Sequence, residues 1–494
     1  MSGQNSQQTV GPVPDTTGES PFVPVALTWL VWLLFAASLA ALAARVRLGG
    51  AWELGGVVAV DGLTVLMWVV VTFFSGIVHS YARRYMAGSR RITAFFATVF
   101  GFTLVVMALV AANHLALFAA LWLAMGLLMA ELVGYASEWS QAQAAASVAR
   151  KYFLASSGLL AVAFTLLWSG TGATTVSGIA AGIDGLSGPV LLAAAGALVL
   201  AAMIQSALIP FHTWLLSSMT APTPASALMH AGFVNAGGIL LARFAPVVTV
   251  DTTLMFAIVV VGAASALLGK LLKTVQADIK SELGCSTVGQ MGFMIMQAGL
   301  GFFGAAITHL ILHGFYKAYH FLSSGGQVEH TNPAESESPG IGLTGAAVVG
   351  VTGLAGGALF AALTGKGTSL DSGLLLVLFV VLTTLHAARS TIKHTSLSAT
   401  ARYGAVPLVF IPAITVYALV YEAISSVLSG LPVVAAPTEL SAPHVVVAAV
   451  FLAIYVAIET GVHERSHRLY VALLNASQPA PDTVLTATED YNEY

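Results

Sequence analysis

Four basic side chains share one otherwise apolar stretch of the chain, residues 306–325 (AITHLILHGFYKAYHFLSSG). His309, His313 and Lys317 follow one another at intervals of four residues, and each such step on an α-helix turns only about 40°, so all three lie on one face. His320 lies three residues beyond Lys317. Histidine titrates near neutral pH, and a lysine removed from water releases its proton more readily than usual. The spacing therefore predicts proton transfer along one face of a helix.

Two other interpretations of this row are a polar packing seam and a metal site. Three titratable groups on one face, one of them a lysine within an apolar span, make a packing seam the weaker interpretation. His309 and His313 have the i, i+4 spacing of metal ligands, but the glutamate of an HExxH motif is absent and Lys317 would repel a cation. We therefore expect no metal and no other cofactor in this chain.

The composition of the whole chain indicates the class of protein. The chain has 494 residues, of which 57% are hydrophobic and 8% charged, whereas soluble domains carry about 25% charged residues. This predicts an all-α polytopic membrane protein. Cys285 is the only cysteine, which excludes an intrachain disulfide and a cysteine-built metal site. Lys317 lies midway along its span, where a charge costs about 2.5–3.5 kcal/mol, so it must face protein or water.

Hydropathy predicts about 14 transmembrane helices, since a span needs about 20 mostly apolar residues. A disordered tail is expected at residues 1–20, and an amphipathic segment followed by an acidic tail at residues 464–494. The expected spans are 22–45, 58–80, 93–111, 113–134, 151–169, 187–209, 223–246, 253–273, 284–299, 303–325, 341–364, 372–388, 404–428 and 443–463.

Basic residues alternate between the two sides of these spans. Thirteen fall in the even-numbered loops or at the C-terminal end, and four fall in the odd-numbered loops. Because cytoplasmic loops are enriched in Lys and Arg, both termini are expected in the cytoplasm. The first group is Arg83, Arg84, Arg90, Arg91, Arg150, Lys151, Lys273, Lys280, Arg389, Lys393, Arg402, Arg465 and Arg468, and the second is Arg45, Arg47, Arg243 and Lys366.

A second informative stretch covers residues 205–243 (QSALIPFHTWLLSSMTAPTPASALMHAGFVNAGGILLAR). Pro210 interrupts one span, and Pro222 and Pro224 begin the next. Proline removes a backbone donor, and lipid tolerates the resulting break only where protein or water satisfies the freed groups. Broken helices at membrane depth are typical of ion and substrate sites in transporters. His230 lies one to two turns into the second helix, where it is either a packing residue or part of a proton path.

Some charged residues lie outside these two stretches. Asp61, immediately before Gly62, predicts a helix N-cap. Lys270 lies near a helix end, from which its side chain can reach the membrane surface. Glu422 and Glu459 lie within apolar spans, so each needs a partner or water.

In combination, these stretches resemble one family. The strings PFHTWLLSSMTAPTPASALMHAG, ADIKSELGCSTVGQMGFM and HLILHGFYKAYHFLSSG, with VDGLTVLMWVVVTFFSGIVHSYARRYM upstream, are similar in order and spacing to the antiporter-like family. This family comprises the large proton-pumping membrane subunits of complex I and those of Mrp-type antiporters. The resemblance covers residues 58–330. It implies two inverted five-helix repeats with broken helices, and a hydrated proton path that includes His230, His309, His313 and Lys317.

The resemblance also assigns boundaries along the chain. The repeats are expected at residues 113–246 and 253–400. N-terminal helices at 21–112 precede them, and C-terminal helices at 401–463 follow.

The chain departs from the family at several positions. The family has an acidic residue where this chain has Leu123, and the nearest acid is Glu131. It has a lysine five residues before Pro210, where this chain has Gln205. The first repeat therefore lacks the usual glutamate–lysine pair, which leaves Gln205, Glu131 and His320 as possible members of the path. The lysine expected in a second broken helix is matched only by Lys366, which could equally lie in an exposed loop.

One branch of this family comprises the membrane subunits of the Dab complex, which accumulates inorganic carbon. The chain is similar to that branch in length, in the absence of a long lateral helix, and in lacking the first-repeat pair. This implies a non-enzymatic, cation-conducting subunit, with protons favoured over sodium, in the bacterial inner membrane. Its expected partner is a DabA-like soluble zinc protein on the cytoplasmic side, and no nucleic acid is expected. The alternative is a pump or Na⁺/H⁺ antiporter subunit of a complex I or Mrp-type complex.

Overall fold

A computed structural model describes residues 22–326, 342–394, 398–461 and 465–484. Most of these residues are helical, and the only sheet in the described part is a small hairpin. The tail expected at 1–20 and the last ten residues of the acidic tail lie outside the described residues. The all-α prediction is confirmed.

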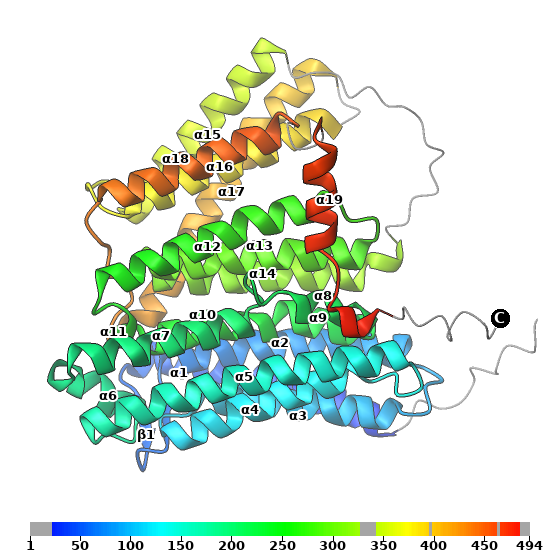
Figure 1. Cartoon of the computed structure of the whole chain (residues 1–494), viewed down its shortest axis with the longest axis vertical. Helices are drawn as coiled ribbons and strands as arrows, with labels where there is room; N and C mark the ends of the chain where they lie inside the picture. Colours follow the sequence, from blue (N-terminus) through cyan, green and yellow to red (C-terminus); the bar gives the residue numbers. More distant parts are fainter. Residues whose placement is uncertain (1–21, 327–341, 395–397, 462–464, 485–494) are drawn as a thin grey trace, which may run out of the picture.

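Most of the helices are long and run roughly side by side (Figure 1). In chain order they are α1 (Phe22–Leu48), α2 (Gly62–Tyr85), α3 (Ile92–Ala111), α4 (Leu115–Val133), α5 (Ser140–Thr171), α7 (Gly188–Gln205), α9 (Thr223–Ala231), α10 (Ala236–Arg243), α12 (Thr252–Lys273), α13 (Ile279–Gly299), α14 (Phe303–Leu322), α15 (Leu343–Thr364), α16 (Gly373–His394), α17 (Ala399–Val427) and α18 (Ala442–Glu459). Besides α9 and α10, the short helices are α6 (Val176–Gly182), α8 (Thr213–Ser217), α11 (Ala245–Val248) and α19 (His467–Ala476).

Each of the 14 expected spans coincides with helix in the structure, with α9 and α10 together forming the span 223–246. Eleven of these, within the described residues, are long and apolar enough to cross a membrane. The other three are α13 and α14, which carry more polar side chains, and α16, whose apolar part is short. Several boundaries differ from the expected ones by four or five residues, and two differences change the local structure most. The helix α5 begins at Ser140 rather than residue 151, and residues 58–60 form a strand instead of the start of α2.

Figure 1 shows how the helices are grouped. The helices α1 to α10 form the lower bundle, α12, α13 and α14 lie above it, and α15, α16 and α18 lie outermost, while α17 crosses between the outer group and the lower bundle. Glycines allow α12 and α13 to approach closely. A Cβ built on Gly269 would lie 2.3 Å from the backbone nitrogen of Gly289, so a larger residue there would push the two backbones apart.

The two ends of the bundle differ, and we call them the β1 end and the basic end. At the β1 end, strands β1 (Trp52–Leu54) and β2 (Val58–Val60) pair antiparallel. Four isolated bridges also join the connections at that end: Val58 to Ala112, His114 to Thr175, Phe302 to Ala435, and Asp371 to Glu439.

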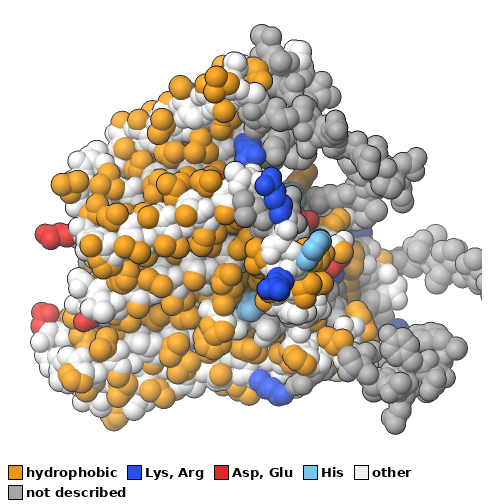
Figure 2. Space-filling model, turned by 45° about the horizontal axis from the view of Figure 1, so that its top comes forward, with side chains coloured by type: hydrophobic (Ala, Val, Ile, Leu, Met, Phe, Trp, Pro, Cys, Tyr) orange, Lys and Arg blue, Asp and Glu red, His pale blue; other side chains and the backbone are white. Residues whose placement is uncertain are grey.

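The basic end is the opposite one, where α2 ends, α3 begins and α12 ends. Arg83, Arg84 and Lys273 lie there, in the last turns of α2 and α12. Figure 2 shows the Lys and Arg side chains gathered toward that end of a largely apolar face.

The side chain of Asp61 caps α2, as predicted, by accepting a hydrogen bond of 2.9 Å from the backbone N–H of Thr64. The same carboxylate forms an ion pair with Arg243 at the end of α10. The guanidinium also donates to the Val110 carbonyl, at 2.8 Å. This pair therefore joins α2, α3 and α10 near the β1 end.

A second charged cluster holds the outer helices. Glu459 of α18 accepts hydrogen bonds from Lys270 of α12 at 3.2 Å and from Arg389 of α16 at 3.1 Å, and it also contacts His386 of α16. Lys270 therefore has an acidic partner instead of only reaching the membrane surface. Glu459, which was expected to need a partner because it lies in an apolar span, thus has partners on both α12 and α16.

The segment after α18 returns to the first half of the chain. The ring Nε2 of His212, just before α8, lies 3.0 Å from the Ala476 carbonyl at the end of α19. The Ser217 hydroxyl accepts a hydrogen bond of 2.9 Å from the backbone N–H of Ala480. The C-terminal segment thus packs against α8 at the basic end, where α19 runs across the long helices (Figure 1).

Candidate proton path

The predicted row lies on α14, on the side that faces the protein. His313 is 5% exposed and Lys317 is fully buried, whereas His309 is partly exposed. The His309 and His313 rings are nearly parallel, with centroids 6.0 Å apart. The three side chains therefore follow one another along a single buried face, as the spacing predicted.

Lys317 is held by a backbone carbonyl. Its ammonium donates a hydrogen bond of 2.8 Å to the carbonyl of Leu283 on α13. No ion pair among the described residues includes Lys317. A buried cation without a carboxylate is costly. Here the charge is stabilised by the Leu283 carbonyl dipole and by the Tyr316 ring, whose centroid lies 5.6 Å from the ammonium.

His230 on α9 is linked to Lys317 through α13. Its ring Nδ1 lies 2.9 Å from the Thr287 hydroxyl, which donates a hydrogen bond of 2.9 Å to the same Leu283 carbonyl. Because the Thr287 hydrogen is used in that bond, Nδ1 of His230 is the donor, and Nε2 is left as the acceptor. Nε2 is buried and has no hydrogen-bond partner among the described residues. The part that Thr287 plays was not predicted from the sequence, because a threonine within a span is not by itself unusual.

The predicted break around Pro210 is present. The helix α7 ends at Gln205, and α8 begins only at Thr213. The carbonyl of Ile204, at the end of α7, accepts a hydrogen bond of 2.9 Å from the indole of Trp214 and one of 3.1 Å from the backbone N–H of Ala207. Gln205 itself is buried, and its Nε2 has no partner among the described residues.

A second interruption lies beside the first. Between α9 and α10 the chain forms a short 3₁₀ turn at Phe233–Asn235. Ser206, in the break after α7, donates a hydrogen bond of 2.7 Å to the Val234 carbonyl in this turn. A side chain in the first break therefore satisfies a backbone carbonyl of the second inside the protein, as irregular backbone at membrane depth requires.

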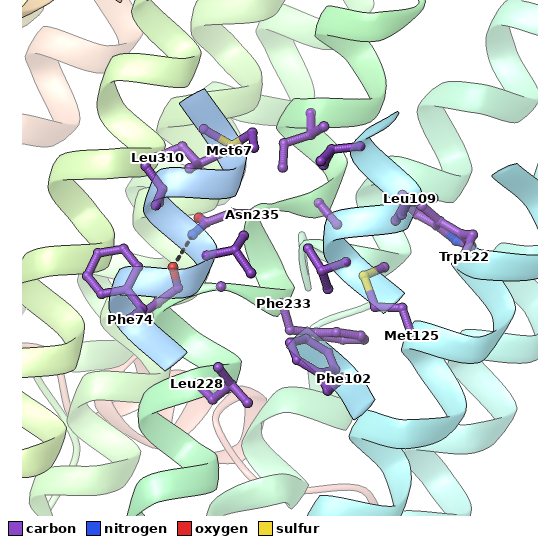
Figure 3. Close-up of a pocket in the computed structure, with 18 of the residues that line it drawn as sticks. Met67, Phe74, Phe102, Leu109, Trp122, Met125, Leu228, Phe233, Asn235 and Leu310 are labelled. Carbon is purple, nitrogen blue, oxygen red and sulfur yellow. Dashed lines mark hydrogen bonds between the residues drawn. The ribbon is translucent and has the colours of Figure 1, made fainter. Parts of the chain in front are cut away.

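An apolar pocket lies in the first half of the chain, between α2, α3, α4, α9, α10 and α14 (Figure 3). Trp122 and Met125 of α4 line it, on the helix where the family carries its glutamate. Asn235 is a polar residue in the wall, and its amide donates 2.7 Å to the Ala231 carbonyl. Apolar side chains thus make up most of the pocket lining, together with Asn235 and Arg243, and Leu123 is not among the lining residues.

Two other candidates, Glu131 and Lys366, are separated from the row. Glu131 is exposed near the basic end of α4, where it lies 3.5 Å from Arg91. This is a surface position, away from the buried row, and its possible part in the path stays a prediction. Lys366 lies in the connection between α15 and α16 at the β1 end, with its ammonium 5.6 Å from the centroid of Phe302. The structure thus favours the loop interpretation for Lys366. His320 lies on α14 against Tyr316 and Tyr319.

The chain is similar to several known proteins. It matches the sequence profile of the family described as "NADH:quinone oxidoreductase/Mrp antiporter, TM" over residues 112–338, and that of "NADH-Ubiquinone oxidoreductase (complex I), chain 5 N-terminus" over residues 52–96. The probable inorganic carbon transporter subunit DabB1 of Halothiobacillus neapolitanus is 41% identical over 290 residues, which is 57% of this chain and 51% of the relative.

The NADH-quinone oxidoreductase subunit L of Mycobacterium tuberculosis is 35% identical over 272 residues, 54% of this chain and 42% of the relative. This chain thus spans about half the length of the curated relatives that it matches.

The fold is also found in a solved structure, the Mrp complex from Dietzia sp. DQ12-45-1b. That likeness covers 93% of this chain and 51% of the matched chain, with a TM-score of 0.56 and 22% sequence identity. The two family profiles together match more than half of the chain. The chain therefore belongs to the antiporter-like family of membrane subunits that includes those of NADH:quinone oxidoreductase and the Mrp antiporter.

Proposed function

We propose that this chain is a proton-conducting membrane subunit that energises inorganic carbon accumulation by a separate catalytic partner. The observation that carries the proposal is the buried linkage of His230, Thr287 and Lys317, with His313 and His309 following on α14. Histidine and a desolvated lysine can both gain and lose protons near neutral pH. Such a linkage is costly to bury, so ion transfer is a better account of it than packing.

The similarity to the probable inorganic carbon transporter subunit DabB1 supports inorganic carbon as the species that is accumulated. A carbonic-anhydrase-like enzyme alone cannot accumulate bicarbonate, because a catalyst leaves the equilibrium unchanged. Protons that move down their gradient through this chain would supply the missing free energy and make hydration of carbon dioxide run in one direction. The proposed partner is a DabA-like soluble protein that holds the catalytic zinc, and this chain is a transport subunit with no catalysis of its own.

We place this subunit in the bacterial inner membrane, with the basic end and both termini in the cytoplasm. The excess of Lys and Arg at that end supports this orientation. The C-terminal segment that packs on α8 then faces the cytoplasm as well. A soluble partner would meet α8, α19 and the ends of α2 and α12.

A second candidate is a proton-pump or Na⁺/H⁺ antiporter subunit of a larger membrane complex. The relative from NADH-quinone oxidoreductase and the fold shared with an Mrp complex favour it. The loss of the first-repeat acid and lysine counts against it, since Leu123 and Gln205 stand at these two positions and neither can carry a proton charge.

The test is to purify the protein from its native membrane and identify what accompanies it. A soluble zinc protein in constant ratio supports the carbon-accumulation proposal, whereas a set of hydrophobic Mrp or complex I subunits contradicts it. In parallel, Lys317→Ala should abolish proton flux in proteoliposomes while the complex still assembles. Flux equal to that of the unaltered protein would contradict the conduction proposal.

A further inference from the structure

Buried polar atoms without a partner continue beyond the row toward the β1 end. Among the described residues they include Nε2 of His309, both ring nitrogens of His313, both amide atoms of Gln297, and the hydroxyl of Ser425. Gln297 is fully buried on α13, and Ser425 lies on α17. Buried polar groups are nearly always hydrogen-bonded to protein or to ordered water. A series of them on neighbouring helices indicates a route for water.

The first step of this route runs from His309 along α13. The His309 ring lies against Phe293 of α13, with the ring centroids 5.3 Å apart. Gln297 is four residues further along α13, on the same face and about one turn nearer the β1 end. A short chain of water can cross a gap of about one helical turn, about 5.4 Å.

The next steps lie on α17, which packs against α14. The Tyr417 hydroxyl is close enough to the Gln297 amide to interact with it, although neither amide atom completes a hydrogen bond of ordinary geometry. One turn further along α17, the Tyr421 hydroxyl is likewise close enough to the Ser425 hydroxyl to interact with it, without a hydrogen bond of ordinary geometry. Ser425 in turn lies against the start of α14, where its hydroxyl would be 2.9 Å from a Cβ placed on Gly304.

The route then reaches the β1 end of the molecule. Gly304 donates a backbone hydrogen bond of 3.2 Å to the Val434 carbonyl in the connection after α17. Phe302, just before α14, bridges to Ala435 in the same connection, and the ammonium of Lys366 lies over the Phe302 ring. Lys366 is thus at the mouth of the route and not inside it.

We propose that Gln297, Tyr417, Tyr421 and Ser425, together with water, form the outer limb of the proton path, joining His309 to the β1 end. This rests on the proposed conduction of protons by the chain. Tyrosine and serine hydroxyls both donate and accept hydrogen bonds, and glutamine does so through two atoms. Each hydroxyl accepts a proton on its oxygen from one neighbour and passes its own proton to the next, so it ends unchanged. No lysine or acid is needed within this limb.

Proton flux tests the limb directly. Gln297→Leu and Tyr421→Phe remove hydrogen-bonding atoms while keeping most of the side-chain volume. Each should lower potential-driven proton flux in proteoliposomes by about tenfold or more, because the link between neighbours is lost. The matched control is Tyr403→Phe, the same change on the same helix but in the cluster that packs against Val349 and Ala388, and it should leave flux unchanged.

The outcomes separate this proposal from the proposed function. If Lys317→Ala abolishes flux while Gln297→Leu and Tyr421→Phe both retain it, conduction stands and the outer limb is overturned. If Lys317→Ala retains flux, conduction itself fails.

Water access provides an independent readout that does not depend on flux. In a Cys285→Ser background, which has no other cysteine, Ser425→Cys and Gln297→Cys should react with a small water-soluble thiol reagent added from the β1 side. The control is Val406→Cys, a fully buried α17 position in the apolar cluster beside Ala388, which should react at least about tenfold more slowly, since a buried thiol away from water is inert. Equal, slow labelling at all three positions would overturn the proposal even if the variants lose flux.

Discussion

The Lys317 ammonium lies 2.8 Å from the Leu283 carbonyl, in the first half of α13. A carbonyl can stabilise a cation but cannot take its proton, so this contact holds the side chain in place without fixing its charge. The neighbouring Thr287 hydroxyl donates to the same oxygen. The Leu283 carbonyl therefore accepts from both groups, and so connects Lys317 to the hydroxyl that orients His230.

Lys317→Met should separate stability from transport. The substitution keeps an unbranched side chain of similar length but removes a buried, unpaired cation, so the thermal midpoint in detergent should stay the same or rise. Proton flux should fall by about a hundredfold or more, as expected for the loss of a proton-transfer group. A variant that loses both stability and flux would indicate that Lys317 has a structural role.

Thr287 should act through its hydroxyl. Thr287→Val preserves shape and removes the link between His230 and the Leu283 carbonyl, so flux should fall by about tenfold. Thr287→Ser restores the hydroxyl and should recover most of the flux. If Thr287→Val retains flux while Thr287→Ser loses it, the volume of the side chain and not its hydrogen bonds is what matters.

Hydropathy was sufficient to predict most of the fold. Long apolar runs gave the spans, and Pro210 gave the break after α7, because both are local properties of the chain. The first turns of α5 were missed, since residues 140–150 (SQAQAAASVAR) are too polar to resemble a span. Contacts between distant helices were not predictable. The Lys270–Glu459 pair joins residues 189 positions apart, and Glu459 in an apolar span was the sole sign of it.

The candidate site was predicted in part. Residues that share one helix, such as His309, His313 and Lys317, follow from spacing alone. Thr287 and Gln297 could not be found in this way, because their importance comes from how α13 packs against α9, α14 and α17. The exposure of Glu131 could not be predicted either, since a position on a helix does not show which side chains face solvent.

Gln205→Ala should be much milder than Lys317→Met. Gln205 is buried at the break but cannot carry a proton charge, so its loss should lower flux by no more than about threefold, the effect of a weak hydrogen bond. Parallel flux measurements on the two variants check this. A loss in Gln205→Ala as complete as in Lys317→Met would show that the first repeat still takes part in proton transfer.

Asp61 gives a pH-dependent test. Burial would raise the pKa of its carboxyl, but the charge and hydrogen bonds of Arg243 and the hydrogen bonds from Thr64 outweigh burial and hold that pKa below its ordinary value. The ion pair thus stabilises the fold above the ordinary aspartate pKa of about 3.9, and the contribution is lost as pH falls through the lowered value.

Asp61→Asn keeps a good N-cap but removes the charge. It should lower the free energy of unfolding by about 2–3 kcal/mol at neutral pH, and the difference from the unaltered protein should shrink below about pH 4. Unfolding in denaturant across pH measures this. A difference that stays constant from pH 7 to pH 3 would contradict the assignment.

Glu459→Gln should loosen α18. It leaves Lys270 and Arg389 without their carboxylate, at a cost of about 1–3 kcal/mol. Backbone amides of α18 should therefore exchange with deuterium faster than in the unaltered protein, whereas those of α2 should exchange at the same rate. The control is Glu131→Gln, whose pair with Arg91 is exposed and should contribute almost nothing. Unchanged exchange in α18 would show that packing alone holds this helix.

The isolated bridges at the β1 end have a consequence for synthesis of the chain. Two of them lie within residues 58–175, and the other two within residues 302–439. Among the described residues, none of these bridges joins the two sets. The first set can form once residue 175 has left the ribosome, whereas the second must wait until residue 439 is made. The helices α2, α3 and α4, which line the apolar pocket, are therefore synthesised before α17, which completes the outer limb.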